Sequence, residues 1–76
     1  MESLLEYIGK LLVSHPDDFK VEKRDEGEVD GYYLTVHPDD FGQVIGRQGR
    51  TARALRAVVR AAAAKQGRRA SVEIVE

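Results

Sequence analysis

The segment from Arg50 to about Gln66 has the strongest helical pattern in the chain, and a glycine stands on either side of it. With side chains about 100° apart around a helix, its apolar residues fall on one face: Leu55, Val58, Val59 and Ala62. A stripe of arginines lies on the opposite face: Arg50, Arg53, Arg56 and Arg60. A helix with one apolar face must be covered by a second layer, and a chain of 76 residues can supply only a small one.

The other patterned segments predict two more helices and three strands. A helix begins near Ser3, with apolar residues at three- and four-residue steps, and ends near Pro16. A short helix runs through Phe41 to Ile45, with Asp39 or Asp40 as its cap. Strands are predicted where apolar and polar residues alternate: residues 19–22, 32–37 and 70–75.

The order α-β-β-α-α-β predicts an α+β fold, a two-layer sandwich with a three-stranded mixed sheet and helices on one face. The first two strands should pair as a hairpin across the turn-rich, charged stretch of residues 25–31. The crossover through two helices should set the second and third strands parallel. Residues 1–76 are therefore predicted to form one domain.

The two halves of the chain carry opposite charge, although the formal net charge is only −1. Residues 1–41 hold eleven acidic and four basic side chains, whereas residues 42–76 hold eight basic and two acidic ones. The basic half suggests an anionic partner. Cysteine is absent, which excludes disulfides, thiolate zinc sites and thiol catalysis. With no apolar run of membrane length and no basic amino-terminal signal, the sequence predicts neither a membrane span nor a secretory signal.

One pentapeptide occurs twice, as His15-Pro16-Asp17-Asp18-Phe19 and as His37-Pro38-Asp39-Asp40-Phe41. Its His and Asp side chains are competent metal ligands, but adjacent Asp residues in a turn point in different directions, and no sequence pattern brings the two copies together. We therefore predict that Pro-Asp-Asp serves as stop and cap at two element boundaries, with no metal site and no cofactor.

The Gly-Arg-Gln-Gly segment at residues 46–49 lies between the short helix and the long one. Its glycine spacing fits neither a P-loop nor a dinucleotide-binding fingerprint. Two glycines around two polar residues let the backbone approach a ligand closely, and the N–H groups that start the next helix favour an anion. This predicts phosphate binding, with Arg47, Arg50 and Arg53 close enough to reach the same ligand.

Val44-Ile45-Gly46-Arg47-Gln48-Gly49, after a strand and a short helix and before a long helix and a strand, resembles the core of a KH domain. The additional amino-terminal helix and strand match the type II arrangement, and over essentially the whole chain the sequence is similar to the small single-KH bacterial proteins of the KhpA family. The resemblance implies a loop that clamps about four single-stranded RNA nucleotides over an apolar groove. It also implies a cytoplasmic RNA chaperone or post-transcriptional regulator linked to cell-envelope and cell-size control. The implied partners are a second copy or a larger KH protein of the Jag (KhpB) type.

Carried onto this sequence, the resemblance assigns close backbone approach to the two glycines, phosphate contact to Arg47 and Gln48, and the groove floor to Ile45. Charge geometry adds Arg50 and Arg53, so the predicted RNA-binding residues are Ile45, Gly46, Arg47, Gln48, Gly49, Arg50 and Arg53. Arg68 and Arg69 are placed near the far groove wall. Ala52 stands where KH cores commonly carry a long aliphatic residue, and no aromatic residue adjoins the loop. We therefore expect weak, salt-sensitive and poorly sequence-selective binding.

A protein–protein interaction module, with RNA binding supplied mainly by its partner, is the alternative function. A domain this small has a marginal core, so exposed apolar or small side chains on its helices could pack on another subunit. The candidates are Leu5, Tyr7 and Val13 on the first helix and Ala57, Ala61 and Ala64 on the long one. No enzyme is predicted, because no Ser, His and acid occur at motif spacing and both histidines precede prolines at turns.

Overall fold

The structure is a computed structural model that describes residues 1–76. Its elements are α1 (Glu2–Leu12), η1 (Pro16–Asp18), β1 (Lys20–Glu26), β2 (Val29–Thr35), α2 (Pro38–Ile45), η2 (Arg47–Gly49), α3 (Arg50–Lys65) and β3 (Arg69–Val75), where η marks a single 3-10 turn. The predicted order of helices and strands is confirmed, and the two 3-10 turns are additional. None of the helices combines the length and the apolar character that a membrane crossing requires.

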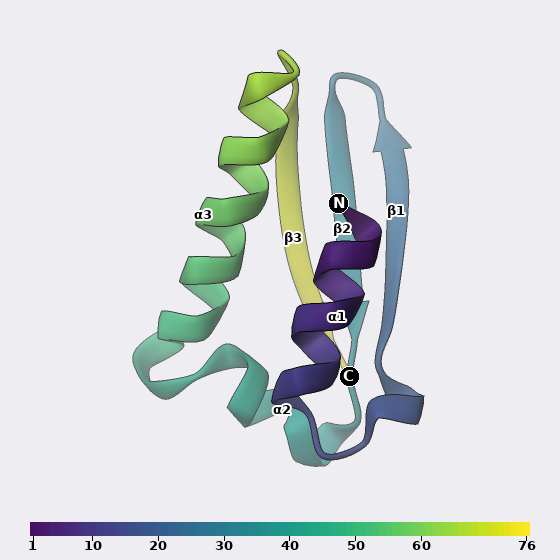
Figure 1. The fold of residues 1–76 in the computed structure, drawn as a ribbon, viewed down its shortest axis with the longest axis vertical. Helices are drawn as coiled ribbons and strands as arrows, with labels where there is room; N and C mark the ends of the chain where they lie inside the picture. The colour runs from purple at the N-terminus through teal and green to yellow at the C-terminus, as the bar shows by residue number, and fades with distance from the viewer.

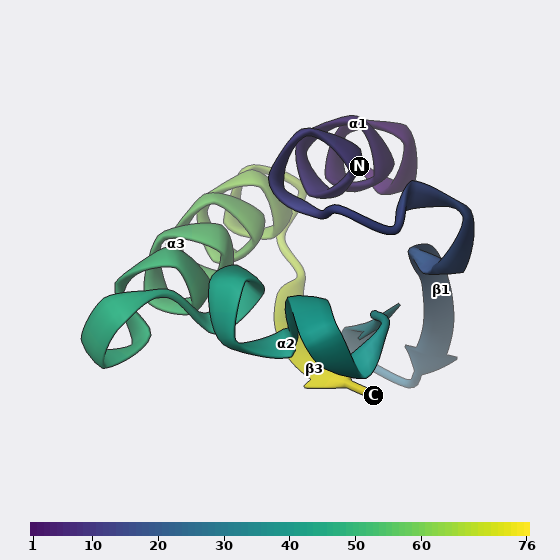
Figure 2. The same cartoon turned by 90° about the horizontal axis from the view of Figure 1, so that it is seen from below.

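The three strands form one mixed sheet in the order β1-β2-β3. β1 pairs antiparallel with β2, and β2 pairs parallel with β3, with Tyr32 opposite Val72. Figure 1 shows α1 in front of β2 and α3 along the β3 edge of the sheet, and Figure 2 shows both helices on the same side of it. The predicted two-layer α+β sandwich, with its hairpin and its parallel crossover, is confirmed.

The hairpin between β1 and β2 is tighter than the sequence predicted. The strands stay paired as far as Glu26 and Val29, so only residues 27–28 form the turn. Asp30, expected in the turn, lies in β2 with 7% of its surface exposed. It accepts hydrogen bonds from Arg68 at 2.7 Å from Nη2 and 3.0 Å from Nε, and this pairing lowers the pKa of Asp30. Arg68, 38 residues away, thus makes it possible for Asp30 to lie in β2, although the local composition predicts a loop at this residue.

The core lies between the sheet and the helices and contains nine buried residues: Leu5, Phe19, Tyr32, Leu34, Val36, Val44, Leu55, Val59 and Val72. On α3, Leu55 and Val59 are buried as predicted, but Val58 is 50% exposed. Ala52 is 2% exposed, so the inner stripe of α3 follows residues 52, 55 and 59. The apolar stripe is narrower than the sequence suggested because α3 faces only the β3 side of a small sheet.

Asp40 lies in the first turn of α2, against the segment that follows α1, and only 2% of its surface is exposed. Its carboxylate accepts hydrogen bonds from the backbone N–H of Ser14 at 3.0 Å and of His15 at 2.9 Å, and from Nδ1 of His15 at 3.1 Å. The predicted cap of α2 by Asp39 or Asp40 is therefore wrong. The cap is His37, whose Nδ1 accepts from the backbone N–H of Asp39 at 3.0 Å.

The pKa of Asp40 reflects two opposing effects. Burial raises the pKa of Asp40, but the hydrogen bonds from the Ser14 and His15 backbones and from the His15 ring together lower it below the ordinary 3.8. As the pH drops, the unfolded chain therefore takes up a proton at this residue before the folded chain does. The stabilisation is fully present above the unfolded pKa of 3.8 and is lost as the pH falls through the folded pKa.

We predict that Asp40→Asn lowers stability at neutral pH and flattens the acid dependence of unfolding. Urea unfolding measured from neutral pH down to pH 3 checks this, with the exposed Asp17→Asn as the control that should follow the parent chain. Part of the acid dependence should remain in Asp40→Asn, because Asp30 also has a lowered pKa. Parallel stability curves for Asp40→Asn and the parent chain would contradict the assignment.

Candidate nucleic-acid interface

The glycine loop (residues 46–49) is a tight turn that joins α2 to α3. Gly46 has φ 82° and ψ 168°, a conformation open essentially to glycine alone, and Gly49 has φ 74° and ψ 14°. Gln48 also has a positive φ, at 57°. Two backbone hydrogen bonds close the turn, from Gly46 N to the Gly42 carbonyl and from Gly49 N to the Gly46 carbonyl, at 2.9 and 3.0 Å.

Gly46 is required for space as well as for its backbone angles. A Cβ atom on Gly46 would overlap Oγ1 of Thr51 and would lie 2.8 Å from the Thr51 backbone nitrogen. A Cβ on Gly49 would meet only Nη1 of Arg53, at 3.8 Å. The first glycine therefore lets the chain pass against the start of α3, and the second supplies only the left-handed turn. Sequence reasoning missed the part played by Thr51, because no spacing rule marks a side chain that packs on a glycine.

The loop leads directly into the positive end of α3, a helix of 16 residues. No side chain caps this end, since its N-cap is Gly49, so the first-turn N–H groups remain available to an anion. Arg47, Arg50 and Arg53 are exposed around it, and none of them takes part in an ion pair. Gln48 is exposed beside them, and Ile45 is half-buried at the end of α2. All seven predicted residues thus lie in or beside one turn.

The arginines beyond the loop divide into bound and free ones. Arg56 donates from Nε to the carbonyl of Val72 at 3.2 Å, which fastens α3 to β3. Arg68 donates hydrogen bonds to Asp30 and to the carbonyl of Gly27, so its charge is paired with the Asp30 carboxylate within the fold. Arg60 and Arg69 line a shallow hollow with Arg68, Ala64 and Ala70, at the end of α3 opposite the glycine loop. Arg68 is therefore a structural residue, and of the pair placed near the last strand only Arg69 is an exposed charge.

These features define the class of the protein. A strand, a short helix, a Gly-x-x-Gly turn, a long helix and a parallel strand form the KH core, and the amino-terminal α1 and β1 make it the type II form. A model of the KH domain of KhpA and KhpB matches residues 2–74. The chain belongs to this KhpA/KhpB KH-domain family.

Three relatives agree with this assignment, and each is named RNA-binding protein KhpA. The one from Halalkalibacterium halodurans is 54% identical over 76 residues, which cover all of both chains. The one from Clostridium acetobutylicum is 45% identical over 75 residues, 99% of this chain and all of the relative. The one from Bacillus subtilis is 40% identical over 76 residues, all of this chain and 94% of the relative. No solved structure matches the chain.

Proposed function

We propose that the protein binds single-stranded RNA through the glycine loop and the first turns of α3. The observation that carries this proposal is the uncapped start of α3, with three exposed arginines that have no acidic partner. The RNA-binding names of the relatives support it. A phosphate placed at this turn would meet backbone N–H groups, the helix dipole and arginine side chains together.

Each predicted residue has a distinct part in the proposal. Gly46 and Gly49 let the RNA backbone approach the turn, and Arg47 and Gln48 contact phosphate. Ile45 offers an apolar surface to a base at the groove floor. Arg50 and Arg53, one turn apart on α3, extend the positive surface along the bound strand. Without an aromatic platform, affinity depends mainly on charge.

The direct experiment is titration of the full chain into a labelled, unstructured RNA oligonucleotide at several salt concentrations. Three arginines on phosphates predict that log K falls with log salt with a slope of about −2 for a single strand. Arg53→Gln should make the slope shallower by about 0.7, because one phosphate contact is lost. The exposed Arg24→Gln on β1 is the matched control and should leave the slope unchanged. Absence of binding even at low salt would refute the proposed function.

The physiological part of the proposal follows from the family. Residues 1–76 would act as a single non-enzymatic KH domain, a cytoplasmic RNA chaperone or post-transcriptional regulator connected to cell-envelope and cell-size control. One copy that holds about four nucleotides binds weakly, so a second KH copy would raise affinity through effective concentration. The family model spans both KhpA and KhpB, which favours a larger KhpB-type KH protein as one such partner.

The second candidate function, an interaction module, rests on an exposed apolar face of α1. Leu4, Tyr7 and Leu11 are 46%, 66% and 70% exposed and lie at helical spacing along one side. The earlier candidates Leu5 and Val13 are wrong, because Leu5 is 2% exposed and Val13 packs against the core. On α3 the exposed apolar side chain is Val58, beside the exposed small residues Ala57, Ala61 and Ala64.

We predict a concentration-dependent homodimer in sedimentation velocity experiments. Tyr7→Asp together with Leu11→Asp should shift the chain toward monomer, because two charges would enter the apolar contact. Lys10→Asp, on the same helix, is the control for added acidity and should dimerise like the parent chain. A parent chain that stays monomeric at high micromolar concentration would remove the homodimer and leave only the heteromeric partner.

A further inference from the structure

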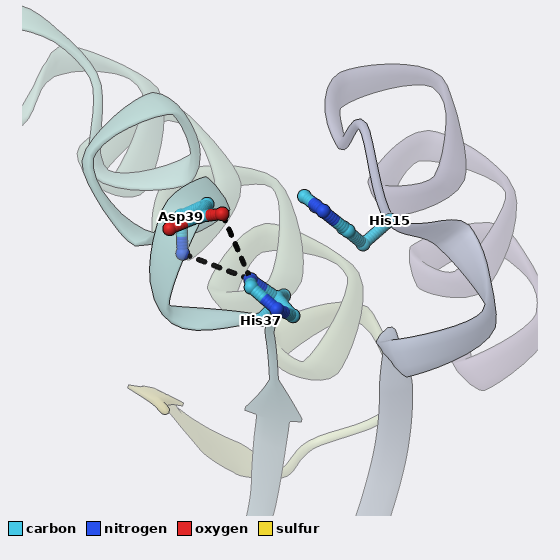
Figure 3. Close-up of side chains that lie close together, drawn as sticks. All are labelled: His15, His37 and Asp39. Atoms are coloured by element: carbon cyan, nitrogen blue, oxygen red, sulfur yellow. Dashed lines mark hydrogen bonds and ion pairs between the residues drawn. The ribbon is translucent and has the colours of Figure 1, made fainter.

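The two copies of the repeated pentapeptide meet in space, although the sequence gave no reason to expect it. The imidazole rings of His15 and His37 are stacked, with centroids 3.9 Å apart and an interplanar angle of 10°. Figure 3 shows the two rings facing each other, with the carboxylate of Asp39 beside them. One ligand atom from each of His15, His37 and Asp39 lies within 4.8 Å of the others. We propose that these three residues bind a divalent transition-metal ion, with Zn²⁺ as the reference ion.

His15 is held in the form that a metal ligand needs. Both carboxylate oxygens of Asp40 accept backbone N–H groups, so Nδ1 of His15 is the donor across its 3.1 Å contact with Oδ2. Nε2 of His15 then carries the free lone pair. A buried carboxylate that orients a histidine in this way is the usual outer-shell support of a metal-bound imidazole. Asp40 therefore has the position of the supporting group, and His15 that of the ligand.

His37 and Asp39 supply the other two ligand atoms from the start of α2. Nδ1 of His37 lies 3.7 Å from Oδ2 of Asp39, a separation that one ion can bridge with bonds of about 2.0–2.2 Å. Nδ1 of His37 accepts a hydrogen bond from the backbone N–H of Asp39, so an ion bound at this atom would displace that helix-capping hydrogen bond. The freed N–H stands at the exposed first turn of the helix, where water can accept it.

The stacked rings must move before both can hold one ion. The lone pair of each imidazole lies in the plane of its ring, and the planes of stacked rings are separate, so one ring has to turn before both can face one ion. The ring of His15 is held by its hydrogen bond to Asp40. The ring of His37 forms one hydrogen bond, with the backbone N–H of Asp39, and lies on the connection between β2 and α2. The side chain of His37 is 33% exposed, and it borders an open hollow lined also by Asp17 and Asp18. The hollow gives His37 room to turn and gives an ion a route from solvent.

The ligand set selects the class of ion. Two imidazoles and one carboxylate suit Zn²⁺, Ni²⁺ or Cu²⁺, whereas Mg²⁺ and Ca²⁺ prefer oxygen ligands throughout. The site is partly exposed, with 39% of the His15 side chain and 74% of the Asp39 side chain accessible, so water would complete the coordination. A bound ion would join the segment after α1 to the start of α2. The site is separate from the glycine loop and does not depend on the proposed RNA binding.

Calorimetric titration of the untagged full chain with Zn²⁺ at neutral pH tests the proposal. We expect one ion per chain, no saturable binding of Mg²⁺ at millimolar concentration, and a melting temperature that rises with Zn²⁺. His15→Gln and His37→Asn should each weaken Zn²⁺ binding about tenfold or more, a loss typical of disrupted metal sites. His37→Asn is chosen because Asn is also a good N-cap, so the helix start is preserved.

Asp17→Asn is the matched control, because it removes a carboxylate from the same hollow without removing a proposed ligand. Its Zn²⁺ affinity should stay within about twofold of the parent chain. Circular dichroism of each variant establishes that it is folded. The proposal is overturned if the parent chain shows no saturable Zn²⁺ binding, or if folded His15→Gln and His37→Asn both bind as tightly as the parent.

Discussion

Replacement of Arg47 and Gln48 by Asp should abolish RNA binding while the domain stays folded. Both side chains are exposed at the centre of the glycine loop, so the change places two negative charges where the proposal puts a phosphate. Hydrogen bonds to charged groups contribute about 1.5–3 kcal/mol each, and repulsion adds to the loss of the Arg47 contact. We therefore expect the RNA affinity to fall about a hundredfold or more, which is roughly 3 kcal/mol.

The substitution suits the backbone of the loop, which separates loss of binding from loss of folding. Gln48 has φ 57° and ψ 26°, in the left-handed region that Asp tolerates better than most residues. Arg47 forms no ion pair within the fold that its replacement could break. Circular dichroism and melting temperature should therefore match those of the parent chain within about 1 kcal/mol of stability.

The control for this prediction is a variant with an even larger change in net charge at a distance from the loop. Lys10→Asp with Lys20→Asp alters the charge by −4, against −3 for the loop variant, and both lysines are exposed. If overall charge governed binding, the control would be the weaker binder; if the loop is the site, the control keeps most of its affinity. Filter binding decides between the two, and unchanged RNA affinity in a correctly folded loop variant would remove the site assignment.

Much of this fold could be predicted because its elements follow local periodicities. The alternation from Tyr32 to Val36 predicts a strand, and the apolar spacing around Leu55 and Val59 predicts α3. The glycine loop was predictable for a similar reason, since its residues are contiguous and both glycines have positive φ. The site residues lie together because the chain places them in sequence order, so no tertiary contact had to be foreseen.

Two of the errors, those on Asp40 and Asp30, concern contacts between residues far apart in the sequence. Asp40 was expected to cap its own helix, but it binds the backbone of Ser14 and His15, 26 and 25 residues away. Asp30 was expected in a turn, but Arg68 holds it in a strand. No local rule distinguishes an Asp that caps its own helix from one that binds a distant segment, because both follow the same short sequence signal.

The second large expected effect is on stability and concerns the contact between α1 and Phe19. Its sign should be opposite to the one that helix propensity predicts. Gly9 is buried within α1, and a Cβ there would lie 2.6 Å from Cε1 of Phe19 and closer still to Cζ and Cε2. Phe19 is 4% exposed in the core, so its ring cannot move aside without disturbing other core side chains. Glycine is therefore required at residue 9, because the Phe19 ring occupies the space of a Cβ atom, although glycine lowers the stability of the helix.

Gly9→Ala should destabilise the domain although it improves the helix. Ala favours a helix interior over Gly by about 1 kcal/mol, whereas overpacking a core costs about 1–3 kcal/mol and more where the neighbour is fixed. We expect a net loss of about 2 kcal/mol, or about 10 °C in melting temperature for a domain of this size. Phe19→Leu in the same chain should recover part of the loss, so that the two substitutions are non-additive in a double-mutant cycle.

Gly42→Ala provides the matched comparison for that result. Gly42 also lies inside a helix, α2, but a Cβ there would meet nothing within 4 Å. The same change should therefore stabilise the domain by about 0.5–1 kcal/mol. Urea unfolding of the two variants should give effects of opposite sign, which propensity alone cannot produce because it predicts a gain in both. A Gly9→Ala chain as stable as Gly42→Ala would show that α1 does not pack on Phe19 as the structure places it.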